Sequence, residues 1–221
     1  MTKPPSRHNA FTLTELVVTI GIILLLSALV MPSLQRAFSS SSKTKCLNRL
    51  RQIQTASITY AGENNGLFPA VNNSYWGPNY FPASIYDQTL KPYLGERNAI
   101  MFCQGELNKV RNPQLASPDY AKSYITYQYF NYGGDFSGTL TGSNKPNLTR
   151  TSTAPGSLPL WGCMATSGGG RSYGHSDPGV SRPLSGMCVV NVDGSARWVN
   201  GTDLEAYAYS AATFYWPTPK R

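Results

Sequence analysis

The sequence predicts an α+β fold in which one long N-terminal helix, transmembrane in its first half, packs against a small antiparallel β-sheet head. Two observations predict it. Helical apolar spacing is confined to roughly the first quarter of the chain, and the β-branched and aromatic runs bounded by Gly, Pro and Ser come later. A helix-first, sheet-later order is typical of α+β domains.

The N-terminal apolar run sets where the helix starts. A bilayer core about 30 Å thick needs roughly 20 helical residues, and residues 16–31 alone are too short. Starting the helix at Phe11 supplies the length. Apolar residues then recur every three to five positions, namely Leu34, Ala37, Phe38, Leu47, Leu50, Ile53, Ile58 and Ala61. This pattern predicts that the helix continues beyond the membrane as an amphipathic half.

Two local signals modify this helix. The serines at residues 39–42 compete for backbone hydrogen bonds, so we expect a weak point that a long helix can bridge. Gly62 and then Asn65-Gly66 predict the end of the helix, at about 50 residues and roughly 75 Å from its start.

Shorter elements follow in the head. A short helix is expected over residues 84–94, with Lys91-Pro92 near its end. Strands are expected at residues 99–103, 123–132 and 158–165.

The clearest β signal is a hairpin near the C-terminus. Asp193-Gly194 lies between two short apolar runs, residues 188–192 and 196–199. An Asp-Gly pair between such runs is a strong hairpin signal.

The charge distribution indicates a membrane rather than a nucleic-acid partner. The net charge is +8, but basic residues cluster on both sides of the apolar run, and beyond Arg51 there are 12 basic and 10 acidic residues. Basic residues beside a membrane segment attract anionic lipid. We therefore expect membrane lipids as partners and no nucleic acid.

Glu15 lies near the N-terminal end of the apolar run and requires an explanation. Insertion of a charged group at the bilayer centre costs about 2.5 to 3.5 kcal/mol. A secretory signal peptide cut near Ser27-Ala28 and a plain signal anchor both leave the carboxylate unexplained. Cleavage between Ala10 and Phe11 explains it. The new α-amino group of Phe11, with a pKa of about 8, can pair with Glu15 of a neighbouring molecule. Such a pair is worth about 4 kcal/mol before desolvation.

The stretch AFTLTELVVTIGIILLLSALVMPSL resembles the cleavage and methylation segment of type IV prepilins and type II secretion pseudopilins. The resemblance implies that a prepilin peptidase removes the leader before Phe11, whose amine is then methylated, and that Glu15 serves assembly. Pro32 falls where many members of the family bend the helix. The family usually has Gly before the cut, where this chain has Ala10.

The resemblance also implies a domain layout. Residues 1–10 form a cleaved leader, 11–32 a transmembrane and filament-core helix, 33–66 the amphipathic half and turn, and 67–221 a globular periplasmic head. Lys3 and Arg7 keep the N-terminus cytoplasmic in a single-pass protein of the bacterial inner membrane. Assembly into a periplasmic or surface filament follows, with other pilin-like subunits and an inner-membrane assembly platform as partners.

The C-terminal region resembles one often attached to prepilin-type segments, where a His precedes Asp-Gly and an aromatic strand. Asp193-Gly194 and Trp198 match, but His175 lies farther upstream than in the family. His175, Asp177 and Asp193 could together hold a divalent cation such as calcium. Alternatively, Asp193 and Gly194 serve only the turn, and His175 bonds a loop.

Four cysteines, Cys46, Cys103, Cys163 and Cys188, lie on the predicted periplasmic side, where disulfides persist. Without a CxxC spacing, zinc is not expected. Of three pairings, we favour Cys46 with Cys103 and Cys163 with Cys188.

Enzymatic residues are scarce. His175 is the sole histidine outside the predicted leader, and GxSxG, HExxH and phosphate-loop motifs are absent from the sequence. We expect no enzymatic activity and no cofactor, with the calcium site as the exception. The alternative is a membrane-anchored periplasmic enzyme or a glycan-binding module that stays outside filaments. The aromatic residues on which a sugar ring could stack are Tyr75, Trp76, Tyr80, Phe81 and Tyr86.

Overall fold

The computed structural model describes residues 12–71, 78–103, 122–130, 155–168, 171–173, 175, 185–209 and 212–217. The chain divides into two compact units, Met1–Ser40 and Ser41–Arg221. The described residues have an α+β layout, with a long N-terminal helix and antiparallel sheets.

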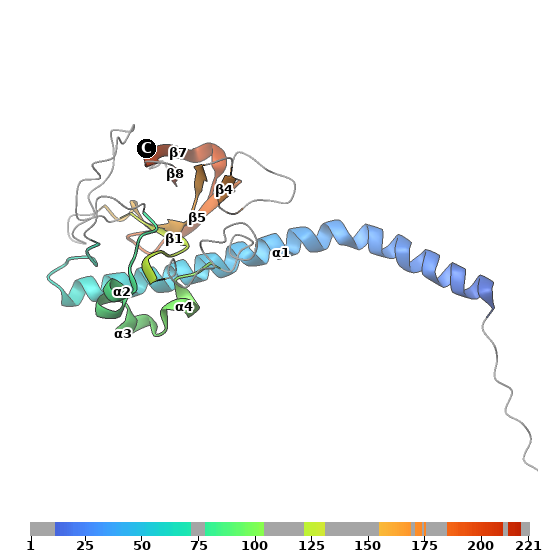
Figure 1. The fold of residues 1–221 in the computed structure, drawn as a ribbon, viewed down its shortest axis with the longest axis horizontal. Helices are drawn as coiled ribbons and strands as arrows, with labels where there is room; N and C mark the ends of the chain where they lie inside the picture. The colour runs from blue at the N-terminus through green and yellow to red at the C-terminus, as the bar shows by residue number, and fades with distance from the viewer. Residues whose placement is uncertain are drawn as a thin grey trace, which may run out of the picture. The chain divides into compact units, whose positions relative to one another are not determined.

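Helix α1, Leu13–Glu63, is the longest element, with 51 residues (Figure 1). It includes Pro32 and continues through the serines at residues 39–42, and the boundary between the two units falls among these serines. The helix ends one residue after Gly62, where the Gly66 amide donates to the Ala61 carbonyl at 2.8 Å. Asn65 has a φ of 55°, the left-handed geometry that Asn adopts at helix ends. The predicted long helix and its stop signal are therefore confirmed, although the helix begins at Leu13, two residues after the expected start.

In the first unit, α1 contains a segment suited to a membrane. Residues Leu13–Leu34 are long and apolar enough to cross a bilayer, and none of that segment's apolar window is buried in the protein. Two of its hydroxyl groups are bonded within the helix, because Thr19 donates to the Leu16 carbonyl and Ser33 to the Val30 carbonyl. A Ser or Thr hydroxyl that donates to a backbone carbonyl of its own helix lowers the free-energy cost of placing that side chain in lipid.

The described residues of the second unit include the short helices α2, Ala83–Thr89; α3, Lys91–Leu94; and α4, Arg97–Ile100. The first two confirm the helix predicted over residues 84–94. Pro92 lies in the first turn of α3 rather than near a helix end, a position where its missing N–H costs nothing.

The strand predicted at residues 99–103 is wrong. That segment contains the end of α4 and a bend. The helical turn is fixed by Arg97, whose buried guanidinium donates to the carbonyls of Phe81 and Tyr124. A short apolar run is compatible with either a strand or a buried helix end. In this segment, tertiary contacts determine that the chain is helical.

The first sheet is antiparallel and has the strand order β1-β2-β5-β6. Its strands are β1, Tyr127–Tyr129; β2, Pro159–Cys163; β5, Gly186–Asn191; and β6, Ala196–Asn200. The runs predicted at 123–132 and 158–165 contain β1 and β2. The predicted hairpin is confirmed as β5 and β6, with Gly194 at a φ of 82° in the turn.

A second antiparallel sheet, of order β4-β3-β8-β7, was not predicted from the sequence. Its strands are β3, Thr166–Gly168; β4, Arg171–Tyr173; β7, Leu204–Tyr209; and β8, Ala212–Pro217, with the short helix η1, Gly201–Asp203, before β7. Gln128 joins the two sheets, since its Nε2 donates to the carbonyls of Cys163 and Tyr215.

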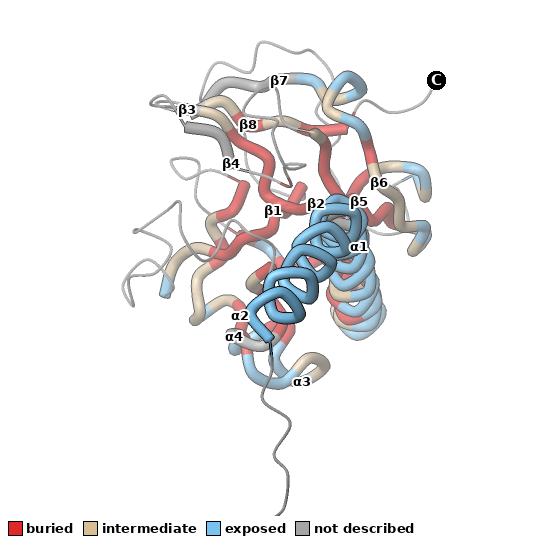
Figure 2. Tube along the Cα trace, turned by 90° about the vertical axis from the view of Figure 1, so that its right-hand side faces the viewer, coloured by how far each residue is buried: buried red, intermediate tan, exposed pale blue. Residues whose placement is uncertain are grey.

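The core of the second unit lies between α1 and the first sheet. Leu50 and Ile53 of α1 are buried together with Trp161, and the Trp161 ring stacks on Tyr129 at 4.2 Å between ring centroids. Figure 2 shows this burial along β1, β2 and β5. Trp161 Nε1 donates to Ser57 Oγ at 3.0 Å, so the helix also supplies the polar partner of the indole.

Candidate functional site

Glu15 caps the start of α1. Its Oε2 accepts hydrogen bonds from the Thr12 amide at 2.9 Å and the Thr12 hydroxyl at 2.8 Å. In return, the Glu15 amide donates to Thr12 Oγ1 at 3.3 Å. This reciprocal pair is a capping box, which satisfies two amides that a helix start leaves without intrahelical partners.

The capping box was missed in the sequence, although the spacing of Thr12 and Glu15 carries its signature. It gives Glu15 a role within one chain in addition to the predicted role between chains. Ala10 and Phe11, the predicted processing residues, lie outside the described residues.

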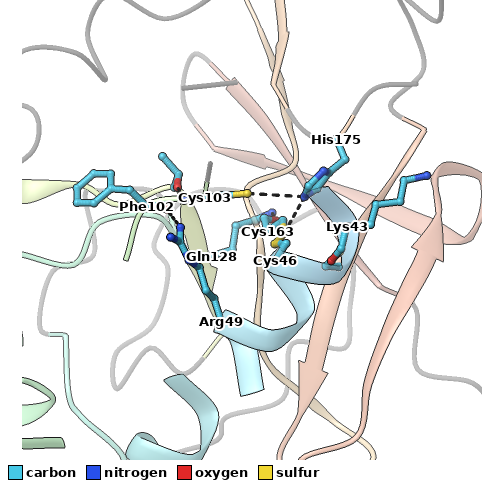
Figure 3. The surroundings of a disulfide bond; sticks show 10 residues. Lys43, Cys46, Arg49, Phe102, Cys103, Gln128, Cys163 and His175 are labelled. Carbon is cyan, nitrogen blue, oxygen red and sulfur yellow. Dashed lines mark hydrogen bonds between the residues drawn. A yellow bond between two sulfur atoms is a disulfide. The ribbon is translucent and has the colours of Figure 1, made fainter. Parts of the chain in front are cut away.

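A second candidate site is a buried cluster formed by Cys46, Cys103, Cys163 and His175, here called the Cys3His cluster (Figure 3). One sulfur or nitrogen atom from each residue lies within 4.8 Å of all the others. His175 Nε2 is 3.3 Å from Cys163 Sγ and 3.8 Å from Cys103 Sγ. All four side chains are between 1% and 8% exposed. The cluster therefore gathers three sulfurs and an imidazole in a space closed to solvent.

Separate elements bring the three cysteines together. Cys46 lies on α1, Cys103 follows α4, and Cys163 ends β2. The segment at Cys103 is held in two places. Arg49 of α1 donates to the Phe102 carbonyl at 2.6 Å, and the Cys103 amide donates to the Thr126 hydroxyl.

His175 is placed by the first sheet. It forms an antiparallel bridge with Gly186, and its ring meets the edge of Trp198 at 5.7 Å between centroids. A Cβ atom at position 186 would lie 2.6 Å from the Trp198 ring, so glycine is needed there. The hairpin of β5 and β6 thus orients the imidazole toward the sulfurs.

Two cations flank Cys46 on α1, at the positions three residues before and after it. The Lys43 ammonium lies 4.1 Å from the centroid of the Trp198 ring, and Arg49 reaches the Phe102 carbonyl. Both positions are within one helical turn of Cys46.

The predicted disulfide pairing is not found. The structure joins Cys46 to Cys163, while Cys103 and Cys188 are outside the disulfide. The prediction was wrong because sequence order does not reveal that β2 lies against α1 at this point. Cys188 is not a member of the Cys3His cluster. Its thiol donates to the Lys43 carbonyl, and burial raises its pKa to about 12.

The predicted group of His175, Asp177 and Asp193 is only partly described. Asp177 lies outside the described residues. The Asp193 carboxylate accepts hydrogen bonds from the Ser195 hydroxyl and amide at 2.6 and 2.9 Å, and these bonds lower the pKa of Asp193. These contacts are those of a turn residue, and His175 faces the cysteines instead.

Comparison of this chain with family models, curated proteins and solved structures gave no match. Function is therefore inferred from the residues and their geometry.

Proposed function

We propose that this chain is a structural subunit of a type II secretion pseudopilus or a type IV pilus-like filament. The observation that carries the proposal is an exposed, membrane-length apolar segment, Leu13–Leu34, that has an acidic residue, Glu15, in its first turn and belongs to the 51-residue helix α1. A helix of this kind can reside in a bilayer and then in a filament core, because both surroundings are apolar.

Processing and assembly follow from the chemistry of the helix start. Cleavage between Ala10 and Phe11 by a prepilin peptidase creates a cationic amine next to the apolar helix. The Glu15 carboxylate of an adjacent subunit can neutralise it. This pairing favours the packed filament over the isolated membrane subunit, because charges buried without a partner are costly.

The proposed location is the bacterial inner membrane, with Lys3 and Arg7 on the cytoplasmic side and the head in the periplasm. Other pilin-like subunits and the assembly platform are the proposed partners. The role requires no catalytic site. Phe81 and Tyr86, two aromatics considered for glycan binding, are buried and pack in the core, which supports a structural role.

The test is assembly in a bacterium that expresses the chain together with a prepilin peptidase and a filament assembly platform. Glu15→Val is compared with Thr19→Val, a matched change from a polar residue to Val within the same span. Both variants should insert in the membrane, and only Glu15→Val should disappear from the sheared filament fraction. Wild-type recovery of Glu15→Val would refute the proposed role of Glu15 in assembly.

A further inference from the structure

We propose that the Cys3His cluster binds one zinc ion through Cys46, Cys103, Cys163 and His175, in place of the disulfide between Cys46 and Cys163. Three thiolates and one imidazole form a donor set typical of structural zinc sites. The proposal departs from the absence of zinc expected from the sequence, where the four ligands are scattered over 130 residues with no CxxC pair.

The distances suit a tetrahedral site. Zinc binds sulfur at about 2.3 Å and imidazole nitrogen at about 2.0 Å, so neighbouring ligand atoms should be about 3.5 to 3.8 Å apart. The two distances from His175 Nε2, 3.3 Å to Cys163 and 3.8 Å to Cys103, are close to this range. Zinc binding requires only that the Cys46 and Cys163 sulfurs separate, since the four ligand atoms already lie within 4.8 Å of one another.

Backbone geometry also favours a metal over the disulfide. The Cα atoms of Cys46 and Cys163 are 7.5 Å apart. Disulfides usually bring the two Cα atoms within about 6.8 Å of each other, and beyond about 7 Å the backbone must move to form the bond. A zinc ion between the two sulfurs spans the observed separation without moving β2 toward α1.

Two cations lie near the residues that hold the cluster. Binding releases one proton from each of the three thiols and leaves their oxidation state unchanged, so zinc with three thiolates and a neutral imidazole carries a net charge of −1. The Lys43 ammonium lies over the Trp198 ring, which also meets His175, and Arg49 reaches the Phe102 carbonyl next to Cys103. Burial in a low-dielectric site strengthens the attraction between such cations and the complex.

The four buried ligands would complete the coordination of the metal, so the site is structural and leaves no position open for a substrate. It would fasten α1, the segment after α4, β2 and the bridge at His175 to one point. Metal binding at such a point contributes directly to folding.

The test uses the full chain, purified in detergent from a bacterial membrane without reductant, chelator or added metal. Zinc per chain is measured by elemental analysis, and the chain is then unfolded and alkylated so that its mass reports the number of thiols. We expect about one zinc per chain and four alkylated cysteines. A Cys46–Cys163 disulfide with two alkylated cysteines and no zinc would overturn the proposal.

Variants locate the site. Cys103→Ser and His175→Ala should lose zinc, whereas Cys188→Ser, which replaces a buried cysteine outside the cluster, should retain it. Equal zinc in Cys103→Ser and Cys188→Ser would contradict the assignment.

Because a variant can fail to fold, the wild-type chain is also reconstituted with Co²⁺ alone. Thiolate-to-cobalt charge-transfer bands and the intense visible bands of tetrahedral Co²⁺ are expected. A weak octahedral spectrum would exclude the site. These measurements need no filament, so their outcome is independent of the proposed function.

Discussion

At the scale of single residues, separate substitutions can distinguish the capping role of Glu15 from the assembly role that we propose for it. Its carboxylate caps α1 through Thr12, and we propose that it also neutralises the amine of a neighbouring subunit. The capping role needs only a hydrogen-bond acceptor, whereas the assembly role needs a negative charge.

Glu15→Gln should therefore assemble poorly while keeping its helix start. Gln retains an acceptor for the Thr12 amide but loses the charge, so we expect incorporation into sheared filaments to fall by about tenfold or more, equivalent to about 1.4 kcal/mol. Thr12→Val is the control, because it removes the hydroxyl of the capping box and leaves the charge. Equal incorporation of Glu15→Gln and wild type would show that the charge is dispensable.

Asp193 provides a residue-scale test of the hairpin turn. The Ser195 hydroxyl and amide lower the pKa of Asp193 in the folded chain, so the charged carboxylate stabilises the turn. This stabilisation is present above the unfolded pKa of about 3.9 and is lost as the pH falls through the lower folded pKa.

Asp193→Asn should then destabilise the head at neutral pH by about 0.5 kcal/mol, a small effect because the turn is exposed to water. The difference from wild type should vanish in acid. Urea unfolding of the detergent-solubilised chain, followed by near-ultraviolet circular dichroism, measures it at several pH values. A difference that grows toward low pH would contradict the assigned contacts.

At the scale of elements, the strands of the first sheet pack against the second half of α1. Gln54 donates to the Val192 carbonyl of the hairpin, and Ser57 accepts from the Trp161 indole of β2. Apolar spacing predicted that this half of the helix would be buried on one face, but polar contacts fix which strands it meets.

Ser57→Ala should destabilise the head by about 1 to 3 kcal/mol, because it leaves the buried Trp161 indole N–H without its acceptor. Thr59→Ala is the matched control on the same helix. Its hydroxyl donates to the Thr55 carbonyl at an exposed position, so we expect a change within about 0.5 kcal/mol. Similar urea midpoints for the two variants would argue against the Trp161 contact.

Elements with a strong local signal could be predicted from the sequence. The helix α1 and the hairpin at Asp193-Gly194 have apolar periodicity and turn chemistry that act over a few residues. The strand expected at residues 99–103 failed, because the buried Arg97 holds a helical turn there. In the second sheet, β3 and β4 have only three residues each, too few for alternation to be visible, whereas β7 and β8, with six residues each, were overlooked.

The candidate sites were predictable to different degrees. Glu15 could be singled out as a candidate because a carboxylate in an apolar run is a local anomaly. The Cys3His cluster was not found, since its cysteines, Cys46, Cys103 and Cys163, are each more than 50 residues apart in the sequence. Only tertiary structure brings such ligands together, and ligand spacing is informative only when neighbouring ligands share a turn.

At the scale of the whole molecule, the chain combines an apolar helical segment with a globular α+β unit. Its basic residues near the apolar segment lie on both sides of it, and the rest of the chain is nearly balanced in charge. This distribution accords with a subunit anchored in an anionic membrane before assembly.

The central claim is that cleavage at Ala10 creates the amine that Glu15 requires. The most direct measurement is the N-terminal mass of the mature chain, purified from cells that contain a prepilin peptidase. We predict the loss of residues 1–10 and a methylated Phe11 at the new N-terminus. An intact Met1, or a chain that begins beyond Ala28, would contradict the account.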